Sequence, residues 1–276
     1  MYQNNPAVPV NTLPTMYDLP SEDPEEMGLP DKFHDLQPHL LSETCLPATE
    51  KKFIGIDLNL YYDVEHTGWY KRPDWFLVLG RSDSPAQSEL RLSYLIWQEH
   101  IAPFLMVELL SPGTEAEDLG QTLRVVGKPP TKWQVYEQIL RIPYYAVFDR
   151  YSNQFRMFCL QGTKYVEQII SGQGFWFDDL QLGLGVWTGV YEGVEGQWLC
   201  WYDADGNWVP SKQERILKAE QQIDQERQRA ENAEQQVDQE RQRAENAEQQ
   251  VDQERQRADL LAAKLRELGI DTNEIL

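Results

Sequence analysis

The chain has 276 residues, 11% of them aromatic, and a formal net charge of −20. This length predicts one domain of ordinary size with appendages. Residues 51–210 hold 20 acidic residues against 13 basic ones, which argues against tight nonspecific binding to a nucleic-acid duplex through a broad basic face.

Membrane insertion and a disulfide framework are not expected either. No run approaches 18 apolar residues, and the N-terminus lacks the basic-then-apolar order of a signal peptide. Three cysteines, Cys45, Cys159 and Cys200, share no CxxC spacing, so neither disulfide bonds nor a zinc site is indicated. The sequence therefore favours a cytoplasmic protein without a membrane partner.

Residues 1–46 are rich in proline, asparagine and acidic residues and show no sustained periodicity. We predict an extended or disordered segment, with a short helix near residues 31–39. His34 and His39 lie five positions apart, which does not place them on one helical face, so we expect solvated histidines rather than metal ligands.

The domain proper is predicted over residues 47–210. Residues 53–62 have the alternation and the β-branched and aromatic content of a strand, and residues 70–79 repeat it after a polar turn, which predicts a hairpin-like pair. Asp57 shares a face with Gly55 and Asn59. It lies either near a functional site or at a strand edge facing water.

The next strand carries the most informative residue. Residues 104–110 form an apolar run ended by Ser111-Pro112-Gly113, which predicts a buried central strand with Glu108 in its middle. An unpaired carboxylate there is costly. If the strand after Asp74 is a neighbour, the two carboxylates meet at one edge and a hard divalent cation offsets their repulsion. Alternatively, Glu108 pairs with a lysine or arginine and Asp74 caps a turn.

Residues 115–120 are predicted to be a loop, and residues 131–140 a helix that begins at the N-cap Thr131. Lys132 lies at the border of the apolar stripe of this helix, a position where lysines are usually solvated. Further strands are predicted at residues 144–149 and, as hairpins, within residues 153–170 and 187–208. This order predicts an α+β fold with a mixed sheet under helical cover.

Residues 211–276 are predicted to be a coiled-coil tail. A 14-residue repeat starts at Gln221, and apolar residues recur at strict sevens from Ile216 to Leu265, the pattern of a left-handed coiled coil. The other seam position alternates between alanine and glutamate until Leu261. The sequence therefore predicts a marginal helix that binds a protein partner or associates weakly with itself.

Several of these pieces together resemble the Uma family of restriction-endonuclease-like domains. The resemblance spans residues 50–210 and rests on Leu58-Asn59-Leu60-Tyr61-Tyr62, Pro73-Asp74, Val107-Glu108-Leu109-Leu110-Ser111-Pro112-Gly113-Thr114, Thr131-Lys132, Tyr136-Glu137-Gln138, Tyr144-Tyr145, Asp149 and Trp201-Tyr202-Asp203-Ala204-Asp205-Gly206-Asn207.

The resemblance implies a variant of the PD-(D/E)XK nuclease core. Asp74 and Glu108 would hold Mg²⁺, or alternatively Mn²⁺, and a lysine would orient or activate the attacking water. The lysine expected two residues after Glu108 is replaced by Leu110, and the family implies that a lysine from the following helix, here Lys132, takes its role. The implied activity is endonucleolytic hydrolysis of nucleic-acid phosphodiesters. The alternative is an inactive nuclease fold that serves as a scaffold and recruits a partner through the tail.

Overall fold

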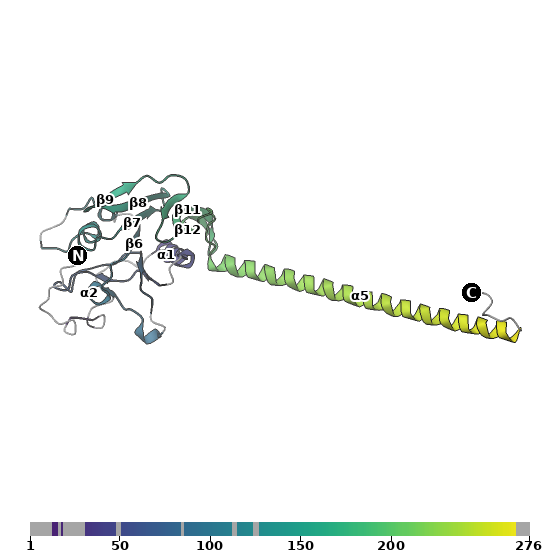
Figure 1. The fold of residues 1–276 in the computed structure, drawn as a ribbon. Coiled ribbons are helices and arrows are strands. Elements are labelled where there is room, and N and C mark those ends of the chain that lie inside the picture. Colours follow the sequence, from purple (N-terminus) through teal and green to yellow (C-terminus); the bar gives the residue numbers. More distant parts are fainter. Residues whose placement is uncertain are drawn as a thin grey trace. The chain divides into compact units, whose positions relative to one another are not determined.

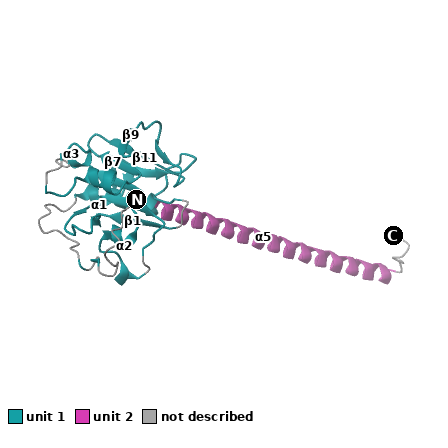
Figure 2. Cartoon of the chain, turned by 60° about the vertical axis from the view of Figure 1, so that its left-hand side comes forward, with its two compact units in different colours: residues 1–212 teal, residues 213–276 magenta. Residues whose placement is uncertain are grey.

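Figure 1 shows the computed structural model of the chain, which describes residues 13–15, 18, 31–47, 51–83, 86–111, 115–123 and 127–268. The chain divides into two compact units, residues 1–212 and residues 213–276 (Figure 2). The helices are α1 (Lys32–Thr44), α2 (Ile96–Glu99), α3 (Glu115–Asp118), α4 (Lys132–Gln134) and α5 (Lys212–Glu267), with a 3-10 turn η2 (Gln87–Glu89) and a π-helical turn η3 (Val135–Ile139).

A six-stranded sheet forms the centre of the first unit. Its strands are β1 (Lys52–Ile56), β4 (Trp75–Leu79), β6 (Leu105–Leu109), β7 (Tyr144–Asp149), β8 (Gln154–Gln161) and β9 (Lys164–Gln168), which lie side by side in this order. The pair β6 and β7 is parallel and all other neighbours are antiparallel. The predicted mixed sheet and α+β class are therefore confirmed.

Two small sheets flank the central one. The first contains β3 (Tyr70–Lys71), β2 (Leu60–Tyr61) and β5 (Tyr94–Leu95), and the second contains β10 (Gly174–Phe177), β11 (Leu182–Tyr191) and β12 (Val194–Tyr202). Alternate residues of β6 face two different hydrophobic clusters. Met106 packs with Tyr136 of η3, whereas Val107 packs with Leu41 of α1 and Trp201 of β12. Both faces of β6 are buried, as its continuous apolar sequence predicts.

The strand predicted over residues 53–62 is divided in the structure. Asp57 adopts a positive φ of 48°, a left-handed conformation that aspartate tolerates better than most residues and that interrupts the extended backbone of the strand. The chain therefore leaves the central sheet after β1 and enters the small sheet at β2. The antiparallel partners are as predicted, because β1 pairs with β4 and β2 pairs with β3.

The N-terminal helix is longer than the sequence suggested. Asp31 caps α1 by accepting hydrogen bonds from the backbone amides of Phe33 and His34, and the helix continues through Pro38 to Thr44. Leu36, Leu40 and Leu41 are buried, so the last part of the segment expected to be extended belongs to the core. Most of residues 1–30 lie outside the described residues.

The second unit is dominated by α5, a helix of 56 residues with no buried side chain. The predicted helical tail is therefore present, and its start lies close to the boundary expected after residue 210. Among the described residues, no helix is both long and apolar enough to span a bilayer.

Candidate functional site

The central sheet brings together the two acidic residues that the sequence singled out. Antiparallel pairing of β4 with β6 sets Trp75 opposite Val107, and the same register continued by one residue sets Asp74 opposite Glu108. Directly opposed residues of antiparallel strands project from the same face. Asp74 accepts a hydrogen bond of 2.6 Å from the Leu109 amide through Oδ2, so its carboxylate is fixed at the end of β6.

Glu108 is completely buried, and both of its carboxylate oxygens have partners. Lys132 donates to Oε2 from 3.0 Å, and the Tyr136 hydroxyl donates to Oε1 from 2.8 Å. The predicted approach of Lys132 to the acidic pair is therefore present. The alternative expectation was that Glu108 pairs with a lysine or arginine and that Asp74 caps a turn. Its first part describes the same contact between Lys132 and Glu108. Asp74, however, accepts a hydrogen bond from the neighbouring strand β6.

Local structure around α4 explains how Lys132 and Tyr136 reach one carboxylate. Thr131 caps the helix as predicted, because its hydroxyl accepts from the Gln134 amide while the Gln134 side chain accepts from the Thr131 amide. The helix then widens into the π-helical turn η3, in which the Leu140 amide bonds to the Val135 carbonyl. Such turns rotate the side chains around them and are frequent at functional sites.

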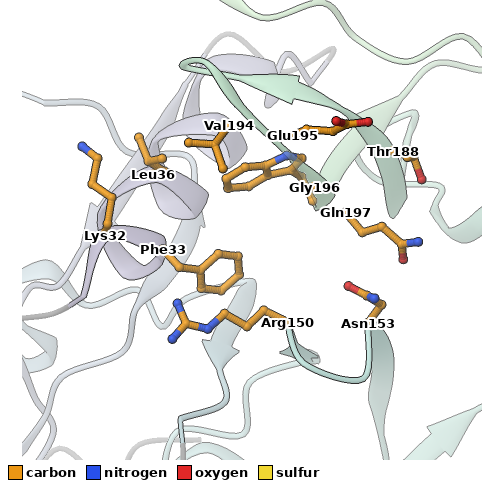
Figure 3. Close-up of a pocket in the computed structure, with 11 residues that line it drawn as sticks. Lys32, Phe33, Leu36, Arg150, Asn153, Thr188, Val194, Glu195, Gly196 and Gln197 are labelled. Atoms are coloured by element: carbon orange, nitrogen blue, oxygen red, sulfur yellow. The ribbon is translucent and has the colours of Figure 1, made fainter.

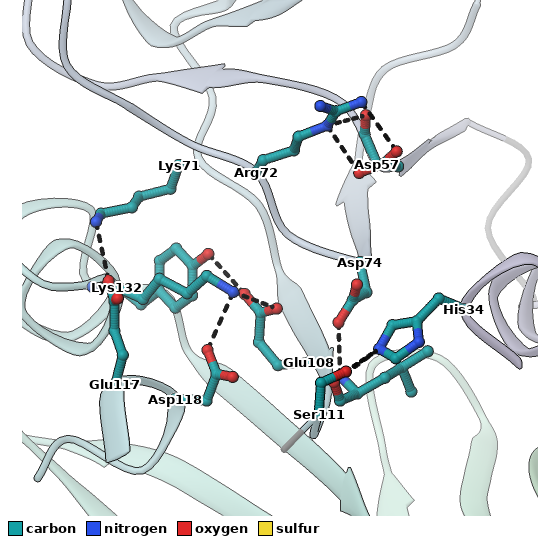
Figure 4. Close-up of polar contacts among 12 residues, drawn as sticks. His34, Asp57, Lys71, Arg72, Asp74, Glu108, Ser111, Glu117, Asp118 and Lys132 are labelled. Atoms are coloured by element: carbon teal, nitrogen blue, oxygen red, sulfur yellow. Dashed lines mark hydrogen bonds and ion pairs between the residues drawn. The ribbon is translucent and has the colours of Figure 1, made fainter. Parts of the chain in front are cut away.

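Asp118 is a third acid at this site and is buried like Glu108, although the sequence analysis placed it in a loop. Its Oδ1 lies 3.0 Å from Lys132 Nζ, yet the orientation is unsuitable for a hydrogen bond and this buried oxygen has none among the described residues. Figure 4 shows Lys132 between Glu108 and Asp118. The Lys132 ammonium group thus lies in ion-pair contact with both of these buried carboxylates.

The neighbouring Glu117 anchors the start of α4. Its Oε1 accepts hydrogen bonds from the Lys132 backbone amide and from Lys71 Nζ, both with a length of 3.2 Å. Burial raises the pKa of Glu117, but the charge of Lys71 and these hydrogen bonds outweigh it and lower the pKa overall. Glu117 therefore stays ionised, and it connects α3 with Lys71 of β3 and with the backbone of Lys132.

The acidic cluster is electrostatically strained. Burial raises the pKa of Glu108 well above its usual range despite the attraction of Lys132, and repulsion from Asp118 and Asp74 adds to the rise. Burial likewise raises the pKa of Asp74. Burial alone would lower the pKa of Lys132, but the carboxylates of Glu108, Asp118 and Asp74 raise it. Among the described residues, the Lys132 ammonium group thus contacts Glu108 and Asp118, and its charge also acts on Asp74.

His34 lies next to this cluster, although the sequence analysis expected it to be solvated. Only 10% of its side chain is exposed. Its Nε2 lies 3.1 Å from the Leu109 carbonyl oxygen and 3.0 Å from Ser111 Oγ, and its Nδ1 lies 3.0 Å from Asp31 Oδ1. Since the carbonyl and the carboxylate both only accept, the ring satisfies both when each nitrogen carries a hydrogen.

The expectation of a solvated His34 was wrong because the partners of this side chain come from β6, about 75 positions further along the chain. A local signal was available, since Asp31 caps the helix and its carboxylate reaches a side chain three positions on. His39 is 58% exposed, as expected for a solvated histidine.

Asp57 occupies the second of its two expected environments. Its carboxylate binds the Arg72 guanidinium, with Nε 2.7 Å from Oδ1, and is 42% exposed. Its backbone amide donates to the Asp74 carbonyl, so Asp57 adjoins the site through the backbone while its side chain points to Arg72 (Figure 4).

The side chains present fit a hard divalent cation with a small protein ligand set. Among the described residues, no three His, Cys, Asp or Glu side chains form a metal-binding group. Mg²⁺, however, commonly takes only one or two carboxylates and completes its shell with water and substrate phosphate. Asp74 and Glu108 supply oxygen ligands, and a cation beside them would offset the repulsion that adds to the raised pKa of Glu108 and would compensate the buried Asp118 oxygen, which lacks a hydrogen bond among the described residues.

A mixed sheet with paired acids at the end of its central strands and a lysine in contact with one of them is the architecture of a restriction-endonuclease-like domain. The comparison with protein families agrees, since the Uma2 family, described as "Putative restriction endonuclease", matches residues 9–189. This match covers well over half of the chain, which therefore belongs to the Uma2 family. A search of curated proteins found no match.

Proposed function

We propose that this protein is a metal-dependent endonuclease that hydrolyses nucleic-acid phosphodiester bonds. Asp74 and Glu108 are the proposed ligands of Mg²⁺ or Mn²⁺, and Lys132 is the proposed catalytic lysine. The observation that carries this proposal is the contact of Lys132 Nζ with Glu108 Oε2 at 3.0 Å. The lysine comes from α4 and not from the position two residues after Glu108 where the nuclease core usually has it. Membership of the family supports the nuclease class.

Each side chain has a definite task in this mechanism. Bound Mg²⁺ would polarise the phosphoryl oxygen and acidify the attacking water. The Leu109 amide orients Asp74 and the Tyr136 hydroxyl orients Glu108, so both carboxylates present fixed oxygens. Lys132 stabilises negative charge that develops on the phosphoryl group. Asp118 keeps the lysine ionised and holds it in position.

A cleavage assay on mixed single-stranded and duplex DNA and RNA tests this function. We expect products in Mg²⁺ or Mn²⁺ and none in EDTA. Glu108→Gln should reduce the rate by several orders of magnitude, whereas Glu115→Gln, which changes an exposed acid of α3, should leave it unchanged. Equal rates for both variants, or cleavage in EDTA, would contradict the proposal.

The second candidate is a catalytically weak scaffold that recruits a protein partner through α5. Two observations favour it. Both oxygens of Glu108 are already occupied by Lys132 and Tyr136, and α5 leaves apolar side chains such as Ile223, Val237 and Val251 more than half exposed. The same assay separates the two, because a scaffold gives no metal-dependent products from the full chain or from residues 1–212.

We propose a cytoplasmic location for the protein, whether it acts as an endonuclease or as a scaffold. Cys45, Cys159 and Cys200 are free thiols, which suits a reducing compartment.

A further inference from the structure

A cavity of about 560 Å³ opens beside the first turn of α1. Three elements surround it, namely the start of α1, the turn between β7 and β8, and the hairpin of β11 and β12 (Figure 3). This volume lies within the range of small-molecule sites. The cavity lies entirely within the first unit.

Flat groups line this cavity and are held in place. The Phe33 and Trp198 rings stack with centroids 5.9 Å apart and an interplanar angle of 25°. The Arg150 guanidinium lies 5.1 Å from the Phe33 centroid and binds both oxygens of Asp31, at 2.9 and 2.6 Å. Trp198 and Arg150 thus cover much of the Phe33 ring, and the cavity presents the parts of Phe33 and Arg150 that remain exposed, against which a planar ligand can pack.

The cavity also contains an unsatisfied donor. Trp198 is only 3% exposed, and among the described residues its buried Nε1 has no hydrogen-bond partner. A Cβ built on Gly196 would lie 3.4 Å from this nitrogen, so the glycine leaves space beside it. The amide side chains of Asn153 and Gln197 also line the cavity (Figure 3). A ligand with a flat face and acceptor atoms at its edge would satisfy these groups.

A chain of hydrogen bonds connects this cavity to the candidate site. Asp31 binds Arg150 on one side and His34 on the other, and His34 contacts the Leu109 carbonyl. Consecutive residues of α1, Phe33 and His34, thus face the cavity and the acidic cluster respectively. The parallel strands β6 and β7 end at the same sheet edge, where a substrate strand can pass from one to the other.

We propose that the cavity binds one unpaired nucleobase of the strand whose phosphodiester is held at Asp74 and Glu108. This inference rests on the proposed function and specifies its substrate as nucleic acid with a single-stranded segment. A nucleobase has a flat face for the aromatic rings and edge atoms for Trp198 and the two amides. Because the domain is acidic, stacking supplies affinity that phosphate contacts cannot.

Fluorescence anisotropy with the full chain tests the inference. The probes are labelled single-stranded 12-mers of DNA and of RNA, intact or with one abasic site moved position by position, with Ca²⁺ in place of Mg²⁺. Gly196→Val fills the cavity beside the indole nitrogen, and Trp198→Phe keeps a ring but removes the N–H. Gly68→Val is the matched control, since nothing lies within 4 Å of a Cβ at that exposed glycine.

For the unmodified chain, we expect an abasic site at one position to weaken binding roughly 5- to 150-fold, the usual effect of losing one stacked base. Gly196→Val should weaken binding of the intact probe similarly and abolish the effect of the abasic site. Trp198→Phe should weaken binding of the intact probe several-fold, and Gly68→Val should bind the probes as tightly as the unmodified chain does. The arm that shows the effect, DNA or RNA, identifies the sugar.

Two results would overturn the inference. One is an affinity of the unmodified chain that does not change with the position of the abasic site, a flat abasic profile. The other is the absence of binding to any 12-mer. Neither result depends on the folding of a variant. Cleavage in Mg²⁺ is scored separately. A flat profile with cleavage refutes the cavity and leaves the endonuclease, whereas an abasic effect without cleavage retains the cavity and refutes the endonuclease.

Discussion

Replacing Lys132 by methionine tests the electrostatics of the site most directly. The substitution keeps most of the side-chain volume but removes the ammonium group that lies 3.0 Å from both Glu108 and Asp118. Leaving one member of a buried ion pair without its partner typically costs about 3–5 kcal/mol. For a domain of this size, such a loss lowers Tm by roughly 6–20 °C.

The loss should depend on pH, and its sign follows from linkage. A buried carboxyl group without a counterion has a folded-state pKa above its unfolded value, so it destabilises the folded state increasingly as the pH rises above the unfolded pKa of about 4.3. Keeping one such group protonated costs about 1.4 kcal/mol per pH unit. Because the pKa of Glu108 is already raised in the unmodified chain, both chains carry part of this cost, so the deficit of Lys132→Met should be small at pH 5 and grow towards the full ~3–5 kcal/mol at pH 8.

Thermal denaturation of the full chain at pH 5 and pH 8 measures both quantities. Lys128→Met is the matched control, since it removes an exposed lysine from the loop just before the same helix and should change Tm little at either pH. Mg²⁺ should stabilise Lys132→Met more than the unmodified chain, because a cation then replaces the missing charge. A deficit below about 1 kcal/mol that is the same at both pH values would refute the reasoning.

Three further predictions concern α1 and the tail. His34 contacts the Leu109 carbonyl, and the Leu109 amide holds the proposed metal ligand Asp74. His34→Ala should therefore raise the Mg²⁺ concentration for half-maximal cleavage about tenfold, as loss of groups behind metal ligands usually does, whereas His39→Ala on the same helix should not. Asp31→Ala should cost about 1 kcal/mol at pH 7 by removing the N-cap. Burial raises the pKa of Asp31, but the contacts with His34 and Arg150 outweigh it and lower this pKa to about 2. The stabilisation by Asp31 is therefore present above pH 4 and lost towards pH 2, which denaturation at pH 7 and pH 2 checks. Residues 211–276 alone should sediment as a helical monomer at micromolar concentration, because glutamate and alanine occupy half of the seam, and a stable dimer would show that the seam is stronger.

The strands and the central pair of acids were predictable because local patterns determine them. The apolar run before Ser111 has only one stable place, the middle of a sheet. That the strand after Asp74 lies beside it was an assumption of the sequence analysis, which the pairing of β4 with β6 confirms. The position of Lys132 was predicted through the family resemblance, since its place on the helix alone suggests a solvated side chain.

The residues that sequence reasoning misplaced depend on contacts between distant segments. Asp118 ends a helix of one turn, and Gly120 follows with a φ of +69°, so little local periodicity marks it. The length of α1 was missed because Pro38 lies inside the helix, where proline normally breaks the hydrogen-bond pattern. Packing of Leu40 and Leu41 in the core offsets this cost.

The acidity of the domain and the composition of the site lead to one consistent mechanism of substrate binding. A polyanionic strand is repelled by an acidic surface, and a site with three carboxylates and one lysine repels it further. In the proposed function, a divalent cation at Asp74 and Glu108 would reverse the sign of the local field and would supply the phosphate contact that basic side chains provide in other nucleic-acid-binding proteins. Metal and substrate should therefore bind cooperatively, since each provides charge or ligands that the other lacks.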